Sequence, residues 1–157
     1  MTDRPAPLDA VDLEMVRILR DDGRISITRL AEQVHVSRAS AYARLERLRR
    51  DGVIRGFSAT VDAARLGLGV TAVVLLSAGR SGRFRWREFG KRLAEMPEVE
   101  SAYLVTGEAD IVVVVRTSDN EGLRGLLLER LQGLPHVTDT VTLLVLDEVV
   151  RRPYVLP

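Results

Sequence analysis

Cysteine is absent from the 157-residue chain, and Lys91 is its only lysine. Without cysteine, the protein has no disulfide, no thiolate zinc site and no cysteine nucleophile. The two histidines, His35 and His136, match no metal-ligand spacing, so metal-dependent hydrolysis and a Ser-His-Asp triad have little support. We therefore expect a protein that is not an enzyme and that needs no metal and no cofactor.

Long apolar runs and a leader-like beginning are also missing. No segment approaches the roughly 18 consecutive apolar residues that a membrane-spanning helix needs. Residues Met1 to Leu8 lack the basic and then apolar pattern of a secretory signal. These features predict a cytoplasmic protein with no membrane partner. A hydrophobic fraction of 46% predicts folded domains rather than disorder.

Apolar residues at helical spacing predict three short helices in the first third of the chain. Each helix is expected to begin after a residue that caps helices well, and these residues are Asp9, Ser26 and Ser37. The buried stripe of the third helix is expected to contain Ala41, Leu45 and Leu48. Residues 53–57 follow, and their apolar side chains predict a brief β-hairpin, the wing of a winged helix-turn-helix.

Positive charge gathers around the third expected helix. Ser37 to Arg55 contains six arginines and two acidic residues, although the whole chain carries a net charge of only +1. Such an excess fits either a solvated helix face or a DNA-binding surface. In a helix-turn-helix, the N-terminal half of the second helix enters the major groove, where arginine can read guanine. The side chains expected to face outward and contact DNA are Ser37, Arg38, Ala39, Ser40, Tyr42, Ala43 and Arg47.

After residue 69 the pattern changes to apolar runs of strand length that alternate with amphipathic helices. Strands are expected at 70–78, 99–106, 110–117 and 137–146. One helix is expected at 84–96, with Trp86 on its buried side, and another between a capping box at Ser118 and Glu121 and the breaker Pro135. This βαββαβ order is typical of ferredoxin-like folds.

The expected protein is therefore of the α+β class, with a helical domain followed by a βαββαβ domain. Its parts are expected to be a winged helix-turn-helix over 1–57, a connector over 58–69, the βαββαβ domain over 70–149 and a tail over 150–157.

The expected strands contain apolar residues at successive positions, as in Val73–Leu76, Ile111–Val115 and Leu143–Leu146. Side chains alternate across a strand, so both faces of this sheet are apolar. Two helices can cover only one face. We infer that a second subunit covers the other face. The alternative is that the N-terminal domain or the connector folds over it.

Four segments carry a resemblance to a known family. LDAVDLEMVRILRDDGRIS and LAEQVHVSRASAYARLERLRRDGVIRGFSATVD closely resemble the Lrp/AsnC, or feast/famine, family of bacterial and archaeal regulators. MPEVESAYLVTGEADIVVVV and LPHVTDTVTLLVLDEV resemble that family's RAM domain, which regulates by binding amino acids. The resemblance runs from about Leu8 to Val149. It implies a transcription regulator that binds double-stranded DNA and forms dimers through its RAM sheets, then tetramers or octamers.

The resemblance also implies an effector site near a subunit interface, with an amino acid as the effector. Carried over residue by residue, this site consists of Thr106, Gly107, Glu108, Ala109, Asp110, Thr140 and Thr142. Gly107 would free backbone N–H groups for a carboxylate, and Asp110 could receive an ammonium group. Ala109 departs from the bulkier residue that relatives often have. The alternative is an ordinary hairpin turn, in which Gly and Asp are common.

Two other functions remain open. One is an amino-acid-binding assembly module that does not control genes. The other is a small enzyme on a ferredoxin-like fold, which needs a nucleophile or an acid–base pair in a cleft. Glu108 and Asp110 have no histidine, cysteine or metal partner near them in the sequence, which argues against the enzyme.

Overall fold

The computed structural model describes residues 7–79 and 85–150, and its contacts divide the chain into two compact units. The first unit runs to Thr60, and the second covers Val61–Val149. This division lies inside the stretch 58–69. Each unit has its own cluster of buried hydrophobic side chains.

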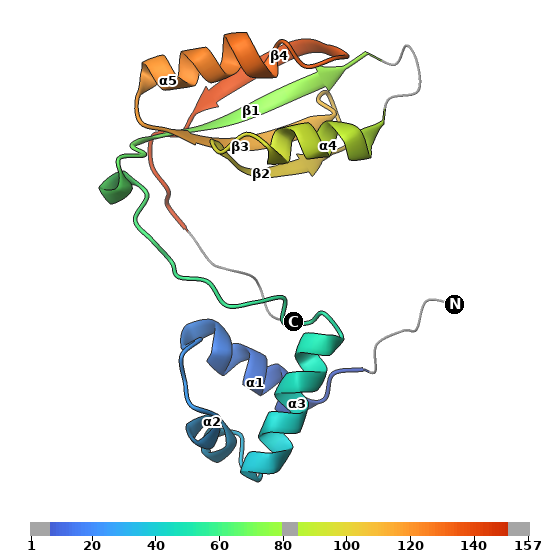
Figure 1. Cartoon of the computed structure of the whole chain (residues 1–157), viewed down its shortest axis with the longest axis vertical. Coiled ribbons are helices and arrows are strands. Elements are labelled where there is room, and N and C mark those ends of the chain that lie inside the picture. The colour runs from blue at the N-terminus through green and yellow to red at the C-terminus, as the bar shows by residue number, and fades with distance from the viewer. Residues whose placement is uncertain (1–6, 80–84, 151–157) are drawn as a thin grey trace. The chain divides into compact units, whose positions relative to one another are not determined.

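The described residues of the first unit form three helices (Figure 1). Their bounds are α1 Ala10–Asp21, α2 Ile27–Gln33 and α3 Arg38–Arg50. The expected caps are confirmed, because each capping side chain accepts a backbone N–H from the first turn of its helix. The core of the unit is formed by Met15, Leu19, Leu30 and Val34. Together α2 and α3 form the expected helix-turn-helix.

The turn between α2 and α3 depends on a residue in the left-handed conformation. His35 has a φ of 55°, and the N–H of Val36 donates to the carbonyl of Ala31 at 3.0 Å. This bond closes the C-terminal end of α2. The chain thereby reverses within a few residues and starts α3 at Ser37.

The expected β-hairpin at 53–57 is wrong, because the described structure contains no strand between α3 and the connector. Instead, Ile54 packs against the helical core and donates its N–H to the carbonyl of Leu48 at 3.0 Å. The ring of Phe57 lies against Gly23, so close that a Cβ there would be 3.1 Å from Cδ1. A two-stranded hairpin alone is only marginally stable, and these contacts hold the segment against the helices instead.

The second unit has the expected βαββαβ order (Figure 1). A 3₁₀ turn, η1 Ala64–Leu66, leads into it. The elements that follow are β1 Val70–Ala78, α4 Trp86–Ala94, β2 Val99–Leu104, β3 Ile111–Thr117, α5 Asn120–Gly125, the π-helical continuation η2 Leu126–Leu131 and β4 Val137–Leu144. The strand order in the sheet is β2-β3-β1-β4, and all neighbouring strands are antiparallel.

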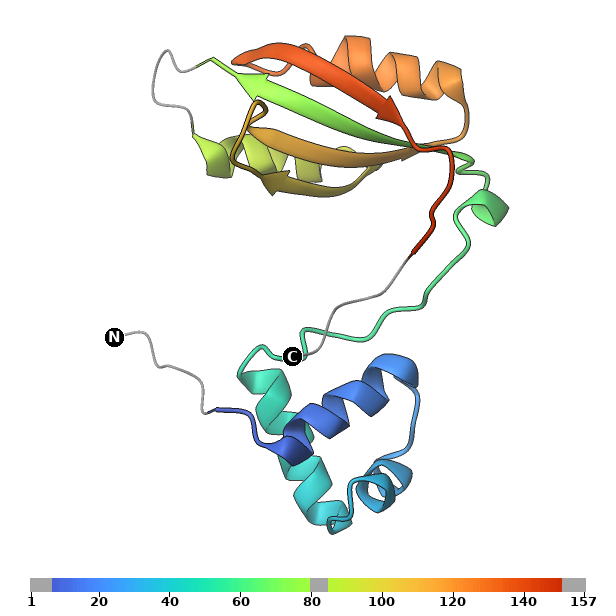
Figure 2. The ribbon, with the colours of Figure 1, turned by 180° about the vertical axis from the view of Figure 1, so that it is seen from behind.

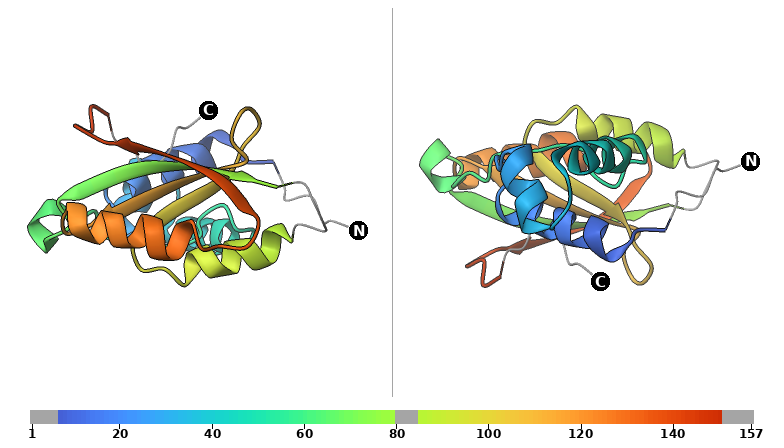
Figure 3. Two further views of the ribbon diagram at one scale, coloured as in Figure 1. Left: turned by 90° about the horizontal axis from the view of Figure 1, so that it is seen from above. Right: turned by 90° about the horizontal axis from the view of Figure 1, so that it is seen from below.

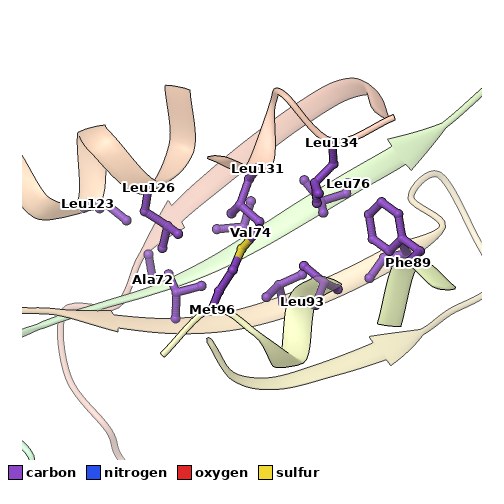
Figure 4. Close-up of a cluster of buried hydrophobic side chains, with 13 residues drawn as sticks. Ala72, Val74, Leu76, Phe89, Leu93, Met96, Leu123, Leu126, Leu131 and Leu134 are labelled. Carbon is purple, nitrogen blue, oxygen red and sulfur yellow. The ribbon is translucent and has the colours of Figure 1, made fainter. Parts of the chain in front are cut away.

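Both helices lie on one face of this sheet (Figure 3). Figure 4 shows leucines from α5 and η2, together with residues of α4 and the turn after it, directed onto the strands. The strand residues beneath them are fully buried at every second position, namely Ala72, Val74, Leu76, Ile111, Val113 and Val115. This alternation is expected of a sheet that buries one face.

The opposite face of the sheet is apolar but only partly covered within the chain. In the view from behind, the strands lie in front of both helices (Figure 2). Leu75 faces Val112 on β3 and Val141 on β4, and the latter is 46% exposed. We call this the outer face and define it by Val73, Leu75, Tyr103, Val112, Val114, Val141 and Leu143.

Several expected details of the second unit are wrong. The cap of α5 is Asp119 rather than Ser118, because the Asp119 carboxylate accepts the N–H of Gly122 at 2.7 Å. Ser118 instead donates to Asp119. Trp86 is 40% exposed, since it is the first residue of α4 and helical side chains lean back over the preceding turn. Phe84, expected at the start of that helix, lies outside the described residues.

The strand ends differ slightly from the prediction, because β2 and β4 each stop two residues early and β3 begins at Ile111. The tail beyond residue 150 lies outside the described residues. None of the helices in the described parts of the chain is long and apolar enough to cross a membrane.

Candidate DNA-binding and effector sites

The exposed surface of α3 lies opposite its buried stripe. Ala41 and Leu48 are fully buried and Leu45 is partly buried, as the helical spacing predicts. Most other side chains of the helix are exposed, and those of Arg44 and Arg47 are half-buried. Of the residues expected to contact DNA, those that are exposed are Ser37, Arg38, Ala39, Tyr42 and Ala43, and Ser40 is half-buried.

The N-terminal end of α3 combines a positive side chain with backbone N–H groups that have no partner within the helix. Ser37 caps this end, where backbone N–H groups point out of the helix and favour an anion such as a phosphate. Arg38 is exposed, and it has no ion-pair partner within residues 7–79 and 85–150. Tyr42 follows one turn later and is 59% exposed. This end of α3 can therefore approach a duplex.

Arg47 does not point outward as expected. Its Nη2 lies 2.5 Å from Oδ2 of Asp12 on α1, and the side chain is 30% exposed. Arg44, one turn earlier, lies 2.8 Å from Oδ1 of the same carboxylate and 2.7 Å from Asp9. The expected outward position of Arg47 is wrong because a buried carboxylate on another helix attracts it.

Asp12 and Arg44 are structural partners that the sequence analysis missed. Asp12 is fully buried, yet it stands three residues before Met15 on the apolar side of α1. An acidic residue inside a buried stripe was the available signal, since a buried charge requires a partner. Burial raises the pKa of Asp12, but hydrogen bonds from Arg47, the Asp9 backbone and Arg44 outweigh it and lower the pKa overall. The carboxylate therefore stays ionised.

The other charged residues of α3 make weaker pairs. Arg49 lies 3.3 Å from Glu46, and Arg50 lies 3.5 Å from Asp51. These arginine side chains are largely exposed, and exposed pairs of this kind contribute little to stability. The guanidinium groups of Arg49 and Arg50 are therefore not held by a buried partner, unlike those of Arg44 and Arg47.

The predicted effector turn connects β2 and β3. Thr106, Gly107 and Glu108 are exposed, while Ala109 and Asp110 are half-buried. Gly107 has a φ of 132°, which L side chains rarely adopt, so glycine is required there by conformation. The turn is anchored to β1, because the Asp110 N–H donates to the carbonyl of Leu76 at 3.0 Å.

Thr140 and Thr142 lie on β4, on the other side of β1 from this turn. Thr140 is the cross-strand partner of Leu76, and Thr142 is the partner of Val74. Leu76 thus connects both parts of the predicted site. Its carbonyl accepts the N–H of Asp110, and its cross-strand partner on β4 is Thr140. Residues 7–79 and 85–150 contain no cluster of acidic and histidine side chains that could hold a metal.

Comparison with family models covers both units. Residues 8–55 match a winged helix-turn-helix DNA-binding model, and residues 71–155 match the model of the Lrp/AsnC ligand binding domain. The chain belongs to the Lrp/AsnC family. It is a DNA-binding transcription regulator that joins a helix-turn-helix to a ligand-binding domain.

Similar proteins agree with this assignment over nearly the whole chain. The transcriptional regulator AldR of Mycolicibacterium smegmatis is 33% identical over 93% of this chain and 85% of its own length. The proline dehydrogenase transcriptional activator of Rhizobium radiobacter is 32% identical, over 90% of this chain and 91% of its own. The structure of a transcriptional regulator–L-Met complex from Neisseria meningitidis has a TM-score of 0.86 at 26% identity. It covers 94% of this chain and 95% of that chain. All three are regulators of transcription by name.

Proposed function

We propose that this Lrp/AsnC regulator reads DNA with the N-terminal half of α3. The observation that carries the proposal is the exposed position of Arg38 and Tyr42 at the capped end of α3, in a helix-turn-helix. The contact residues are Ser37, Arg38, Ala39, Ser40, Tyr42 and Ala43. Arg47 is left out of this set because its guanidinium group lies on Asp12.

Selection from a pool of randomised duplexes, followed by gel-shift titration of the enriched sequence, tests this proposal. We expect Arg38→Ala to weaken binding of the selected duplex, since a good arginine–guanine contact is worth about 1–3 kcal/mol. Arg65→Ala is the matched control, because Arg65 is an exposed arginine outside the helix-turn-helix. The assignment would be contradicted if Arg38→Ala bound the selected duplex, and variants of it with single base changes, with the same affinities as the wild type.

We propose further that the ligand-binding domain takes a free amino acid at the β2–β3 turn. The support is the family match together with the L-Met carried by the Neisseria structure. Backbone N–H groups around Gly107 would meet the carboxylate, and Glu108 and Asp110 would receive the ammonium group. Thr106, Ala109, Thr140 and Thr142 complete the proposed site.

Thermal unfolding in the presence of each of the twenty amino acids tests the effector proposal. A ligand that binds only the folded protein raises the Tm, by an amount that grows with its concentration. Gly107→Ala should abolish the shift, because alanine disfavours the φ of 132°. The absence of a shift with all twenty amino acids would contradict an amino-acid effector.

The third element of the proposed function is assembly. We propose that a second copy of this chain covers the outer face, since an apolar sheet of this extent left in water would promote aggregation. The dimer, and higher oligomers built from it, would place several helix-turn-helix units on one DNA. Sedimentation at decreasing protein concentration should show a dimer, and a monomer at every concentration would contradict this.

A regulator of transcription acts on DNA, so we place it in the cytoplasm.

A further inference from the structure

The Asp12 carboxylate makes ion pairs unlike those within the helices of the first unit. The within-helix pairs, such as Glu14–Arg17, Arg20–Asp21 and Glu46–Arg49, join residues one or three apart and keep at least one partner exposed. The Asp12 carboxylate is fully buried and pairs with side chains 32 and 35 residues later in the chain. Asp12 therefore connects α1 directly to α3.

Both oxygens of the Asp12 carboxylate accept hydrogen bonds. Oδ1 accepts from Arg44 at 2.8 Å, and Oδ2 accepts from Arg47 at 2.5 Å and from the Asp9 backbone N–H at 3.1 Å. Asp9 also accepts from Arg44, so the two acids and two arginines form one network. Breaking a buried pair leaves a charge without a partner, which gives this network a strong preference for a single geometry.

The network also decides which arginines of α3 are available to DNA. Arg38 is exposed, while the guanidinium groups of Arg44 and Arg47 are turned toward α1. Arginines free to reach phosphates add affinity for any sequence, because phosphate contacts carry no sequence information. Holding two arginines away from DNA therefore favours a specific site over random sequence.

We propose that Asp12 is a positioning residue for DNA recognition, which fixes α3 through Arg44 and Arg47 and withholds both arginines from phosphate. The inference rests on the proposed function, since it concerns how the same helix distinguishes sequences. Asp12 touches no DNA itself. Its effect is on the balance between specific and non-specific binding.

Salt dependence of DNA binding by full-length Asp12→Asn tests the proposal. The probes are the duplex selected by the wild type and the unselected random pool. The neutral asparagine side chain loses the ionic attraction for both arginines, although Arg44 keeps its pair with Asp9. Each arginine that reaches phosphate steepens the slope of log affinity against log salt by about 0.9. We expect the slope to steepen by about 1 where only Arg47 is released, and by about 2 where Arg44 also leaves Asp9, and we expect the preference for the selected duplex to fall.

Glu14→Gln is the matched control, because it removes the same charge from α1 but breaks only an exposed pair with Arg17. We expect its slope and preference to equal those of the wild type. A purely structural role for Asp12 predicts that affinity for both duplexes falls together with the folded fraction and that the slope stays unchanged. That result would overturn the proposal.

Arg47→Gln provides an independent test should Asp12→Asn fail to fold. If Arg47 is withheld from DNA, its removal leaves the slope unchanged. A slope shallower by about 0.9 would show that Arg47 already contacts phosphate, which overturns the proposal. If the wild type enriches no duplex at all, the proposed function itself fails. The selection step therefore distinguishes failure of the proposed function from failure of the inference alone, which shows in the slopes.

Discussion

The carboxylate of Asp110 accepts a hydrogen bond from the backbone N–H of Ala78 at 2.8 Å, and so ties the β2–β3 turn to the end of β1. The bond uses Oδ2, and Oδ1 accepts no hydrogen bond from the described residues. Asp110 therefore holds the turn in place with one oxygen, and the other oxygen would receive the ammonium group of the proposed effector. Substitution can separate this structural role from the proposed binding role.

Asp110→Asn should leave the fold intact and abolish the response to amino acids. Asparagine can still accept the N–H of Ala78, but it has no negative charge for an ammonium group. Asp110→Ala removes the acceptor as well and should lower the free energy of unfolding by about 1 kcal/mol. Thermal unfolding with and without amino acids measures both effects. A ligand-induced Tm shift that survives in Asp110→Asn would show that the ammonium group lies elsewhere.

Leu75 and Leu76 are neighbours in β1 that lie on opposite faces of the sheet. Leu76→Ala creates a cavity under the helices, and we expect a loss of about 2–5 kcal/mol in unfolding free energy. Leu75→Ala should instead weaken the proposed dimer, because its side chain lies on the outer face. Urea unfolding and sedimentation of both variants separate these effects. Wild-type association in Leu75→Ala would count against the outer face as the interface.

His35 occupies a left-handed position with a φ of 55°. We expect His35→Val to destabilise the first unit by about 1–2 kcal/mol, since β-branched residues fit this conformation poorly. His35→Gly should be at least as stable as the wild type, because glycine adopts this φ without steric cost. Chemical denaturation of the wild type and the two variants gives the order of their unfolding free energies. A His35→Val protein as stable as the wild type would show that the turn relaxes to another geometry.

Acid should weaken the α1–α3 network. The pKa of Asp9 is lowered, mainly by the Asp12 backbone N–H and by Arg44, and that of Asp12 is also lowered. A carboxyl with a lowered pKa in the folded state stabilises the fold above its unfolded pKa. This contribution is lost as pH falls through the folded value. The first unit should therefore lose stability below about pH 4.

Asp12→Asn provides the control for this acid effect. At neutral pH it should be less stable than the wild type by about 1.5–3 kcal/mol, the usual contribution of hydrogen bonds to charged groups. The difference should shrink as the wild-type carboxylate becomes protonated. Hydrogen exchange of the Met15 amide, measured across the acid range, reports on the first unit alone. A gap that stays constant with pH would mean that Asp12 is not ionised in the fold.

Much of the fold follows from local patterns. Asp9, Ser26 and Ser37 cap their helices as the sequence predicts, because a cap is a contact between residues two or three apart. Apolar runs of strand length, apolar residues at helical spacing and turn residues likewise predict the βαββαβ order, since each of these patterns is set by residues close together in the sequence. The same local rules were insufficient at Ser118, where two acceptors stand side by side and the carboxylate of Asp119 takes the cap.

Except at residues 53–57, the sequence alone determined which helices and strands form and in what order, and which residues of α3 start the helix and stand at its exposed end. Only the tertiary structure decided the direction of Arg47, because its partner Asp12 is 35 residues away and no periodicity links the two. The same holds for residues 53–57, whose apolar side chains pack on the helices rather than pairing as strands. Ion pairing and burial depend on which residues the fold brings close together, and not on how far apart those residues are in the sequence.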